Sequence, residues 1–235
     1  MPVITVSRMF GSGGAVVAQR IARRLGWALY DNAFVEAVAE RLGVPVAEVE
    51  AREERVPNLV RRFADSLALA SPEVLPPTAV ATLPPSEERI VEVTQRIIDE
   101  AVARGPAVFV GRGAHAALST RSDVLHVFCH APKAALVMRV AVRMNVSTKE
   151  AEHLVNETNR QREQYVRKYW KRSWSAHETY HLCLNTEWLG LAGAADLVVR
   201  LAAERFGVEP LPAGADAAID PESQHRHNLS GPFTL

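Results

Sequence analysis

A cluster of glycines near the start of the chain has the composition of a phosphate-binding loop. Gly11, Ser12, Gly13 and Gly14 follow a short β-prone stretch and precede a segment with helical periodicity. Glycines permit positive φ angles and let a phosphate approach the backbone N–H groups at the positive end of a helix. The spacing favours an anion site in this loop, and a tight strand-to-helix turn that binds nothing is the alternative.

The loop lacks two side chains of the common phosphate-binding pattern G-x-x-x-x-G-K-[ST]. When the pattern is aligned on Gly13, Gly14 stands at the lysine and Ala15 stands at the hydroxyl residue. Arg8 could supply part of the missing positive charge by folding over the phosphates, or it could point to solvent. No metal site made of protein side chains is predicted, so Mg²⁺ is expected to be held mainly through substrate phosphates and water.

A cationic run between Asn156 and Arg172 provides further candidates. It holds six Lys or Arg and two Glu, a local charge of +4 in a chain whose formal net charge is +0. The planar guanidinium of arginine can hold two phosphate oxygens at once. We predict Arg162 first and Arg160 second as groups that close over a phosphoryl group. A solvated basic helix face, or a strip that meets RNA with aromatics such as Tyr165, are the alternatives.

Two more polar residues directly follow predicted strands. Arg112 lies between two glycines, two residues after a buried strand, and an arginine there is costly to bury unless it finds an anion. We predict an anion-binding role for Arg112, with a surface salt bridge to a neighbour such as Asp123 as the alternative. Asp31 ends another strand, where it could bind a nucleotide or cap the following helix.

Strands and helices alternate along the chain, which predicts an α/β fold with a parallel sheet flanked by helices. Strands are expected at residues 3–6, 28–30, 107–110, 124–129 and 182–184. Helices are expected at 15–25, from 31 or 32 to about 42, at 46–70, from 86 to about 104, from 132, from 147, and at 193–206. Ligands of such sheets lie at the carboxyl ends of the strands, where the glycine loop, Asp31 and Arg112 all fall.

Four segments resemble the cytidylate kinase-like family of P-loop nucleoside monophosphate kinases. The loop from Ile4 to Gly14 is similar to the family's S-R-x-x-G-S-G-G, which lacks the usual lysine. The other three segments are Tyr30-Asp31, Val110 to Ala114 (similar to G-R-G-A), and Asn159 to Gly190 (similar to the lid helix and the closing L-N-T-x-x-L-G). The resemblance covers residues 3–207 in consistent order.

The resemblance implies a P-loop NTPase-like sheet of five parallel strands with a helical lid and an acceptor-binding region. A single domain is expected at residues 1–208, with the acceptor-binding insertion at about 45–88 and the lid at about 145–178. Residues 209–235 are expected to form a disordered tail.

The same resemblance implies ATP-dependent phosphoryl transfer to a nucleoside monophosphate, with cytidylate as the first choice. ATP and Mg²⁺ would bind at the loop from Gly11 to Ala15. Arg8, Arg160 and Arg162 would be catalytic, and the acceptor would meet Asp31 and Arg112.

A second function remains open because the chain departs from the family's pattern. Ala15 stands where members often carry arginine, and Asn159 stands where the lid normally has aspartate. The proline-rich stretch at residues 71–85 could not be aligned. A catalytically degenerate nucleotide-binding or interaction protein on the same scaffold would carry such losses.

Composition excludes several other classes of protein. The formal net charge of +0 argues against nucleic acid or an anionic membrane as partner. Cys129 and Cys183 are too few for a disulfide framework and are expected to be buried in strands. No apolar run approaches the roughly 18 residues of a membrane span, and residues 1–3 do not resemble a signal peptide. We therefore predict a cytoplasmic globular protein with nucleotide substrates, which could form a homo-oligomer.

Overall fold

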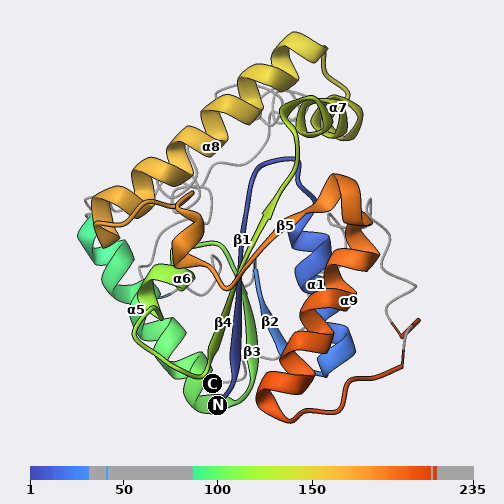
Figure 1. Ribbon diagram of the computed structural model, residues 1–235. Coiled ribbons are helices and arrows are strands. Elements are labelled where there is room, and N and C mark those ends of the chain that lie inside the picture. The colour runs from blue at the N-terminus through green and yellow to red at the C-terminus, as the bar shows by residue number, and fades with distance from the viewer. Residues whose placement is uncertain (32–40, 42–86, 213, 216–235) are drawn as a thin grey trace, which may run out of the picture.

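Five parallel strands form one sheet in the order β2-β3-β1-β4-β5 (Figure 1). They are β1 (Val3–Arg8), β2 (Ala28–Tyr30), β3 (Ala107–Val110), β4 (Val124–His130) and β5 (Leu182–Asn185). β1 is central, because Val3 pairs with Ala107 of β3 and with Val124 of β4. The predicted α/β fold is confirmed, and so are all five strands, three of which run slightly further than expected.

This computed structural model describes residues 1–31, 41, 87–212 and 214–215. The helices expected at 32–42 and 46–70, the proline-rich stretch at 71–85 and most of the acceptor-binding insertion lie outside the described residues. So does most of the expected tail. Among the residues that are described, no helix combines the length and the apolar composition needed to cross a membrane.

Helices cover both faces of the sheet and its carboxyl-terminal edge (Figure 1). One face carries α1 (Gly14–Leu25) and α9 (Thr186–Phe206), and the other carries α5 (Glu87–Arg104) and α6 (Ala114–Ala117). Beyond the carboxyl ends of the strands lie α7 (Lys133–Met144) and α8 (Thr148–Trp170). Two helices, α7 and α8, therefore cover the carboxyl-terminal edge of the sheet.

The two faces of the sheet have separate cores, because strand side chains alternate between them. Ile4 and Val6 of β1 are fully buried against Val17 and Ile21 of α1. On the other face, Ile98 of α5 is also fully buried, in a cluster that includes Val3 and Phe109. The helix expected from 86 to about 104 is thus confirmed as α5.

Local signals set several helix ends. Gly26 ends α1 in the left-handed conformation, with φ 65°, and Ser147 and Glu150 form a capping box at the start of α8, the helix expected from 147. The last helix starts earlier than predicted, at Thr186, because the Asn185 side chain accepts hydrogen bonds from two N–H groups of its first turn. Gly190 has non-helical backbone angles and interrupts this helix. Helical periodicity therefore does not extend through Gly190 to the first turn, which is why the sequence predicted a later start.

One prediction about a cysteine was wrong. Cys129 is buried in β4 as expected, but Cys183 is exposed. The difference follows from topology, because β5 is an edge strand whereas β4 lies between two neighbours.

Removing a core side chain on the α5 face should destabilise the fold. We expect Ile98→Ala to lower the free energy of unfolding by about 2–5 kcal/mol, since it deletes a fully buried side chain and leaves a cavity. Val142→Ala, at a side chain that is 76% exposed, is the matched control and should change stability by about 0.5 kcal/mol or less. Urea denaturation measures both, and equal effects would contradict this packing.

Candidate functional site

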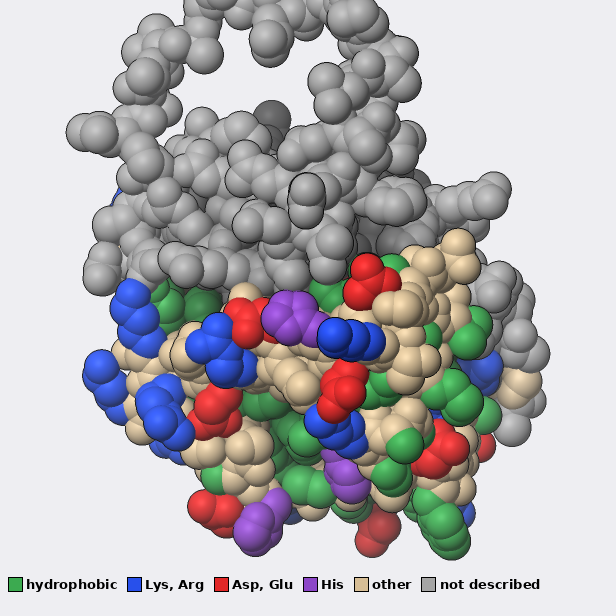
Figure 2. All heavy atoms as spheres, turned by 90° about the horizontal axis from the view of Figure 1, so that it is seen from above, with side chains coloured by type: hydrophobic (Ala, Val, Ile, Leu, Met, Phe, Trp, Pro, Cys, Tyr) green, Lys and Arg blue, Asp and Glu red, His purple; other side chains and the backbone are tan. Residues whose placement is uncertain are grey.

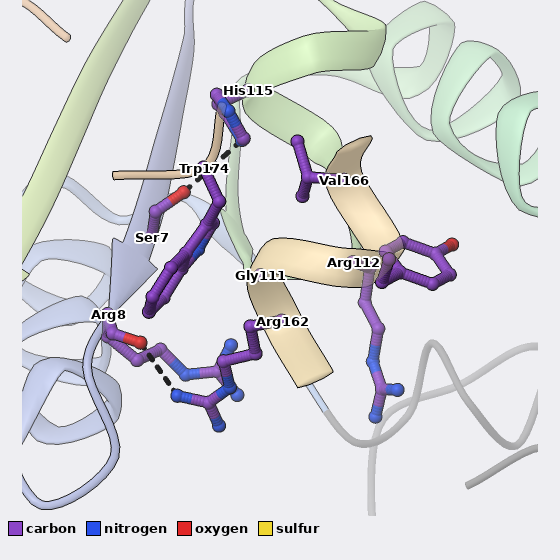
Figure 3. Close-up of a pocket in the computed structure, with 10 residues that line it drawn as sticks. Ser7, Arg8, Gly111, Arg112, His115, Arg162, Val166 and Trp174 are labelled. Atoms are coloured by element: carbon purple, nitrogen blue, oxygen red, sulfur yellow. Dashed lines mark hydrogen bonds between the residues drawn. The ribbon is translucent and has the colours of Figure 1, made fainter. Parts of the chain in front are cut away.

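The carboxyl ends of β1 and β3 open into a pocket that α8 closes from above (Figure 3). The pocket has a cavity volume of about 30 Å³ and is partly open to solvent. Arg8 at the end of β1, Arg112 after β3 and Arg162 on α8 all line it. Three of the predicted cationic residues, from three separate elements, thus border one pocket, with the guanidinium groups of Arg8 and Arg162 on the same side of it. No described residue that lines the pocket is acidic.

Two hydrogen bonds attach α8 to the backbone at the end of β1 and just after it. The Phe10 N–H donates to Asn159 Oδ1 at 2.8 Å, and Arg162 Nη1 donates to the Arg8 carbonyl at 2.6 Å. Asn159 and Arg162 are three residues apart, so they share one helix face. The amide of Asn159 accepts the same N–H that an aspartate could accept, without adding a negative charge.

The Arg8 side chain lies across the pocket and fills the space beside Gly14 and Gly111, which have no side chain. A Cβ on Gly14 would lie 2.6 Å from Arg8 Cβ, and a Cβ on Gly111 would overlap Arg8 Nη1. Arg8 Nη2 is 3.8 Å from Asp31 Oδ1, with both side chains mostly buried. Arg8 therefore does not point to solvent, and its stem fills the space beside the position where the common loop carries lysine.

Arg112 is held in an unusual backbone conformation. Gly111, Arg112 and Gly113 all have positive φ angles, of 71°, 55° and 69°. The left-handed conformation costs a non-glycine residue roughly 1–2 kcal/mol, and such strain concentrates at functional sites. The Arg112 guanidinium extends away from those of Arg8 and Arg162 (Figure 3). Asp123, the neighbour considered as a salt-bridge partner for Arg112, pairs with Arg121 and with the N-terminal amino group.

The glycine loop connects β1 to α1 as predicted. Gly11 and Gly13 have φ angles of 84° and 74°, and α1 begins at Gly14 with no acidic residue in its first turn. The first N–H groups of a helix have no acceptor within it, so they can face an anion. Ser12 and Ala15 lie in this turn, and Ser12 Oγ accepts the Gly14 N–H at 3.4 Å.

Thr186 and Arg139, for which no role is predicted from the sequence, hold this loop in place. Thr186 Oγ1 donates to the Ser12 carbonyl at 2.7 Å, and Arg139 Nη1 donates to Thr186 Oγ1 at 3.2 Å. Thr186 belongs to the L-N-T segment noted in the sequence, which was the available signal. Arg139 had none, because its partner is distant in the sequence.

Arg160 lies outside the pocket. It is 60% exposed and pairs with Glu157 at 2.7 Å, one turn earlier on α8. Arg167 pairs with Glu163 in the same way. Lys and Arg side chains are interspersed with Asp and Glu on the described face of the molecule seen in Figure 2. This pattern is typical of a solvated helix face.

Burial keeps two histidines beside β1 uncharged at neutral pH. The pKa of His115, whose ring lines the pocket, is lowered to about 3 by burial and then by the nearby His126 and Arg172. The pKa of His126 is lowered to about 4 by burial and then by His181 and Arg172. The positive charge lining the pocket therefore comes from its arginines.

Comparison with known proteins gives one family. A sequence profile described as "Cytidylate kinase-like family" matches residues 3–188. No curated protein matches the chain.

A structure with low sequence identity shares the fold. An uncharacterized protein from Eubacterium ventriosum ATCC 27560 superposes with a TM-score of 0.63 at 20% identity, over 87% of this chain and 100% of that one. A gluconokinase from Sinorhizobium meliloti 1021 gives a TM-score of 0.48 at 14% identity, over 88% and 96% of the two chains. A shikimate kinase from Bacteroides thetaiotaomicron gives 0.47 at 14% identity, over 88% and 99%. The first similarity shows a shared fold, and the two weaker ones carry no argument.

Substitutions of Asn159 test whether its side-chain oxygen is the acceptor that protects the Phe10 N–H. We expect Asn159→Ala to raise the hydrogen-exchange rate of the Phe10 amide at least about tenfold, because that N–H loses its acceptor. Asn159→Asp keeps an acceptor oxygen and should leave the exchange rate near that of the wild type. Equal protection of the Phe10 amide in the alanine and aspartate variants, measured by NMR, would contradict the attachment of α8.

The lowered pKa of His115 should make stability depend on pH. Below its ordinary pKa of 6.5 the unfolded chain binds a proton that the folded protein does not, so stability falls as pH falls from 6.5 toward 3. The slope contributed by His115 is about 1.4 kcal/mol per pH unit. We expect His115→Phe to flatten the pH dependence of urea denaturation between pH 6 and pH 4.5, roughly by that slope. An unchanged slope would show that the ring is not held neutral.

Proposed function

The chain belongs to the cytidylate kinase-like family, and from this premise we propose that it transfers the γ-phosphoryl group of ATP to a nucleoside monophosphate, with cytidylate as the preferred acceptor. The observation that supports the proposal is that one pocket beneath α8 is lined by Arg8, Arg112 and Arg162. Phosphoryl transfer requires little covalent chemistry from the protein. It requires alignment of the two substrates and neutralisation of the phosphate oxygens.

The donor nucleotide is assigned to the loop from Gly11 to Ala15. The N–H groups at the start of α1 would hold the terminal phosphates of ATP. Mg²⁺ would enter with ATP as part of the substrate, because position 15 offers no hydroxyl to hold it. The protein would then contact the metal mainly through the phosphates and water.

Arginines at the carboxyl end of the sheet are assigned to the acceptor and the transferred group. Arg112 would hold the acceptor phosphate, with Asp31 near the same end of the sheet. Arg8 would supply the positive charge that the absent lysine normally gives, from the space beside Gly14. Arg162, which the lid helix α8 brings in, would neutralise charge on the transferring group, as a planar guanidinium can.

Arg160 is expected to contribute less than Arg162, because its ion pair with Glu157 holds it on the exposed side of α8. α8 covers one side of the pocket and would limit the access of bulk water. Shielding favours transfer to the acceptor over hydrolysis.

A catalytically degenerate nucleotide-binding protein is the second candidate, supported by one observation. Arg162 Nη1 is engaged by the carbonyl of Arg8, as it would be in a helix that is permanently attached. A working lid would have to release that carbonyl or use the remaining donors of the guanidinium. Kinetics on variants separates the two candidates.

Alanine variants of the pocket arginines test the proposal. In a coupled ADP-release assay with ATP, Mg²⁺ and a panel of nucleoside monophosphates, we expect Arg162→Ala and Arg112→Ala to lower kcat roughly 10²- to 10³-fold. Arg167→Ala, on the same helix but 73% exposed, is the matched control and should keep wild-type activity.

The outcomes distinguish the candidates. Turnover with one acceptor that the pocket variants lose supports the kinase. If no acceptor is turned over while ATP still raises the melting temperature, the degenerate nucleotide-binding protein is favoured. If ATP does neither, both proposals fail.

A further inference from the structure

The start of α9 contacts the glycine loop at two points. Thr186, the first residue of α9, donates from Oγ1 to the Ser12 carbonyl at 2.7 Å. The Leu191 side chain lies against Gly13, where a Cβ would come 2.5 Å from Leu191 Cδ2. In Figure 1 the first turns of α9 lie beside the start of α1. The loop between β1 and α1 is therefore held by a segment that lies 174 positions later in the chain.

The interruption of α9 at Gly190 is what allows both contacts. In an unbroken α-helix, residues 186 and 191 would lie about 140° apart around the axis and could not face the same loop. Gly190 has φ 68° and ψ 164°, so the helix changes course between them. Thr186 and Leu191 can then reach two consecutive residues of the loop.

The surroundings of Thr186 determine where its hydroxyl proton points. The residue is fully buried, and Arg139 Nη1 lies 3.2 Å from Thr186 Oγ1. A guanidinium can only donate, so the hydroxyl accepts from Arg139 and has one proton left to give to a carbonyl. The Ser12 carbonyl oxygen at 2.7 Å is closer than that of His130 at 3.2 Å. The proton therefore goes to Ser12.

This hydrogen bond orients the next N–H group of the loop. The Ser12–Gly13 peptide bond is trans, and in a planar trans peptide unit the C=O and the following N–H point in opposite directions. Because the Ser12 carbonyl is held toward Thr186, the Gly13 N–H is directed to the opposite side, away from α9. Among the described residues this N–H has no hydrogen-bond acceptor. A backbone N–H that is fixed in direction and lacks a protein acceptor is available to a bound phosphate.

We propose that Thr186 is a positioning residue for the donor nucleotide, whose hydroxyl fixes the Ser12 carbonyl and so keeps the Gly13 N–H directed at a phosphate of the donor. The inference rests on the proposed function, because it concerns the same donor site. Thr186 acts through the loop and does not touch the nucleotide, since its hydroxyl is shared between Ser12 and Arg139. Without the hydroxyl, the Ser12–Gly13 peptide plane can rotate. Binding must then reorder the loop, which weakens the affinity for the donor.

Two substitutions of Thr186 separate the hydroxyl from the shape of the side chain. Valine has nearly the same shape without the hydroxyl, whereas serine keeps the hydroxyl without the methyl group. We expect Thr186→Val to weaken binding of MgADP about tenfold or more and Thr186→Ser to retain most of it. Calorimetric titration of the full-length chain, below the melting temperature of each variant, measures both. Thr94→Val, at another fully buried threonine on α5, is the matched control and should bind MgADP as the wild type does.

Cytidine monophosphate distinguishes positioning of the donor loop from a general loss of structure. The residues assigned to the acceptor follow β2 and β3, whereas Thr186 contacts the loop after β1. We therefore expect Thr186→Val to bind cytidine monophosphate as tightly as the wild type does. Equal weakening of MgADP and cytidine monophosphate binding in this variant would indicate a structural role and overturn the proposal. An unchanged affinity for MgADP would overturn it as well.

The amide NMR spectrum of the wild type tests the proposal without any variant. We expect the Gly13 N–H resonance to shift when MgADP is added, because this group gains an acceptor, and its hydrogen exchange to slow at least about tenfold. Binding of MgADP that leaves the Gly13 amide unshifted overturns this inference but not the proposed function. If the wild type binds neither MgADP nor MgATP, the proposed function fails and this inference fails with it.

Discussion

The attachment of α8 to the main chain after β1 determines whether a pocket exists. Asn159 and Arg162 each bond a backbone group of that segment, and the Phe10 ring lies within cation–π distance of both Arg143 and Arg162. These contacts use polar groups that the turn after β1 exposes once the strand ends. They bring a guanidinium from a helix of 23 residues over the carboxyl ends of two strands. Together with the buried apolar side chains of Leu154, Val155 and Val166, they hold α8 as the upper wall of the pocket.

The electrostatics of the pocket follow from this arrangement. Three arginines share a space in which no described lining residue is acidic, and Asp31 lies 3.8 Å from one of them. An anion bound beside these guanidinium groups would be stabilised by their positive charge. The strained backbone at Arg112 is a cost borne at the same end of the sheet, and such strain concentrates at functional sites.

Much of this architecture was predictable from the sequence, and the failures have identifiable causes. The strand–glycine–helix start, the five strands and the carboxyl-terminal location of Arg8 and Arg112 follow from local patterns, since buried strands and helix caps are encoded by neighbouring residues. The environment of an arginine on a helix depends on residues distant in the sequence. Arg162 and Arg160 are the first and second predictions, and in the fold Arg162 donates to the carbonyl of Arg8 whereas Arg160 pairs with Glu157 outside the pocket. Likewise, the contacts of His115 with Ser7 and Tyr180 could not be predicted, because these residues are distant in the sequence and come together only in the folded protein.

The central claim is that a phosphoryl group passes from ATP to a second molecule held by the arginine pocket. ³¹P NMR of the protein with Mg²⁺, ATP and cytidine monophosphate observes the transfer itself, because each phosphorus environment gives its own signal. The account predicts that resonances of ADP and cytidine diphosphate grow together in equal amounts, with little inorganic phosphate. Inorganic phosphate appearing with ADP in place of the second diphosphate, or an unchanged ATP spectrum, would contradict it.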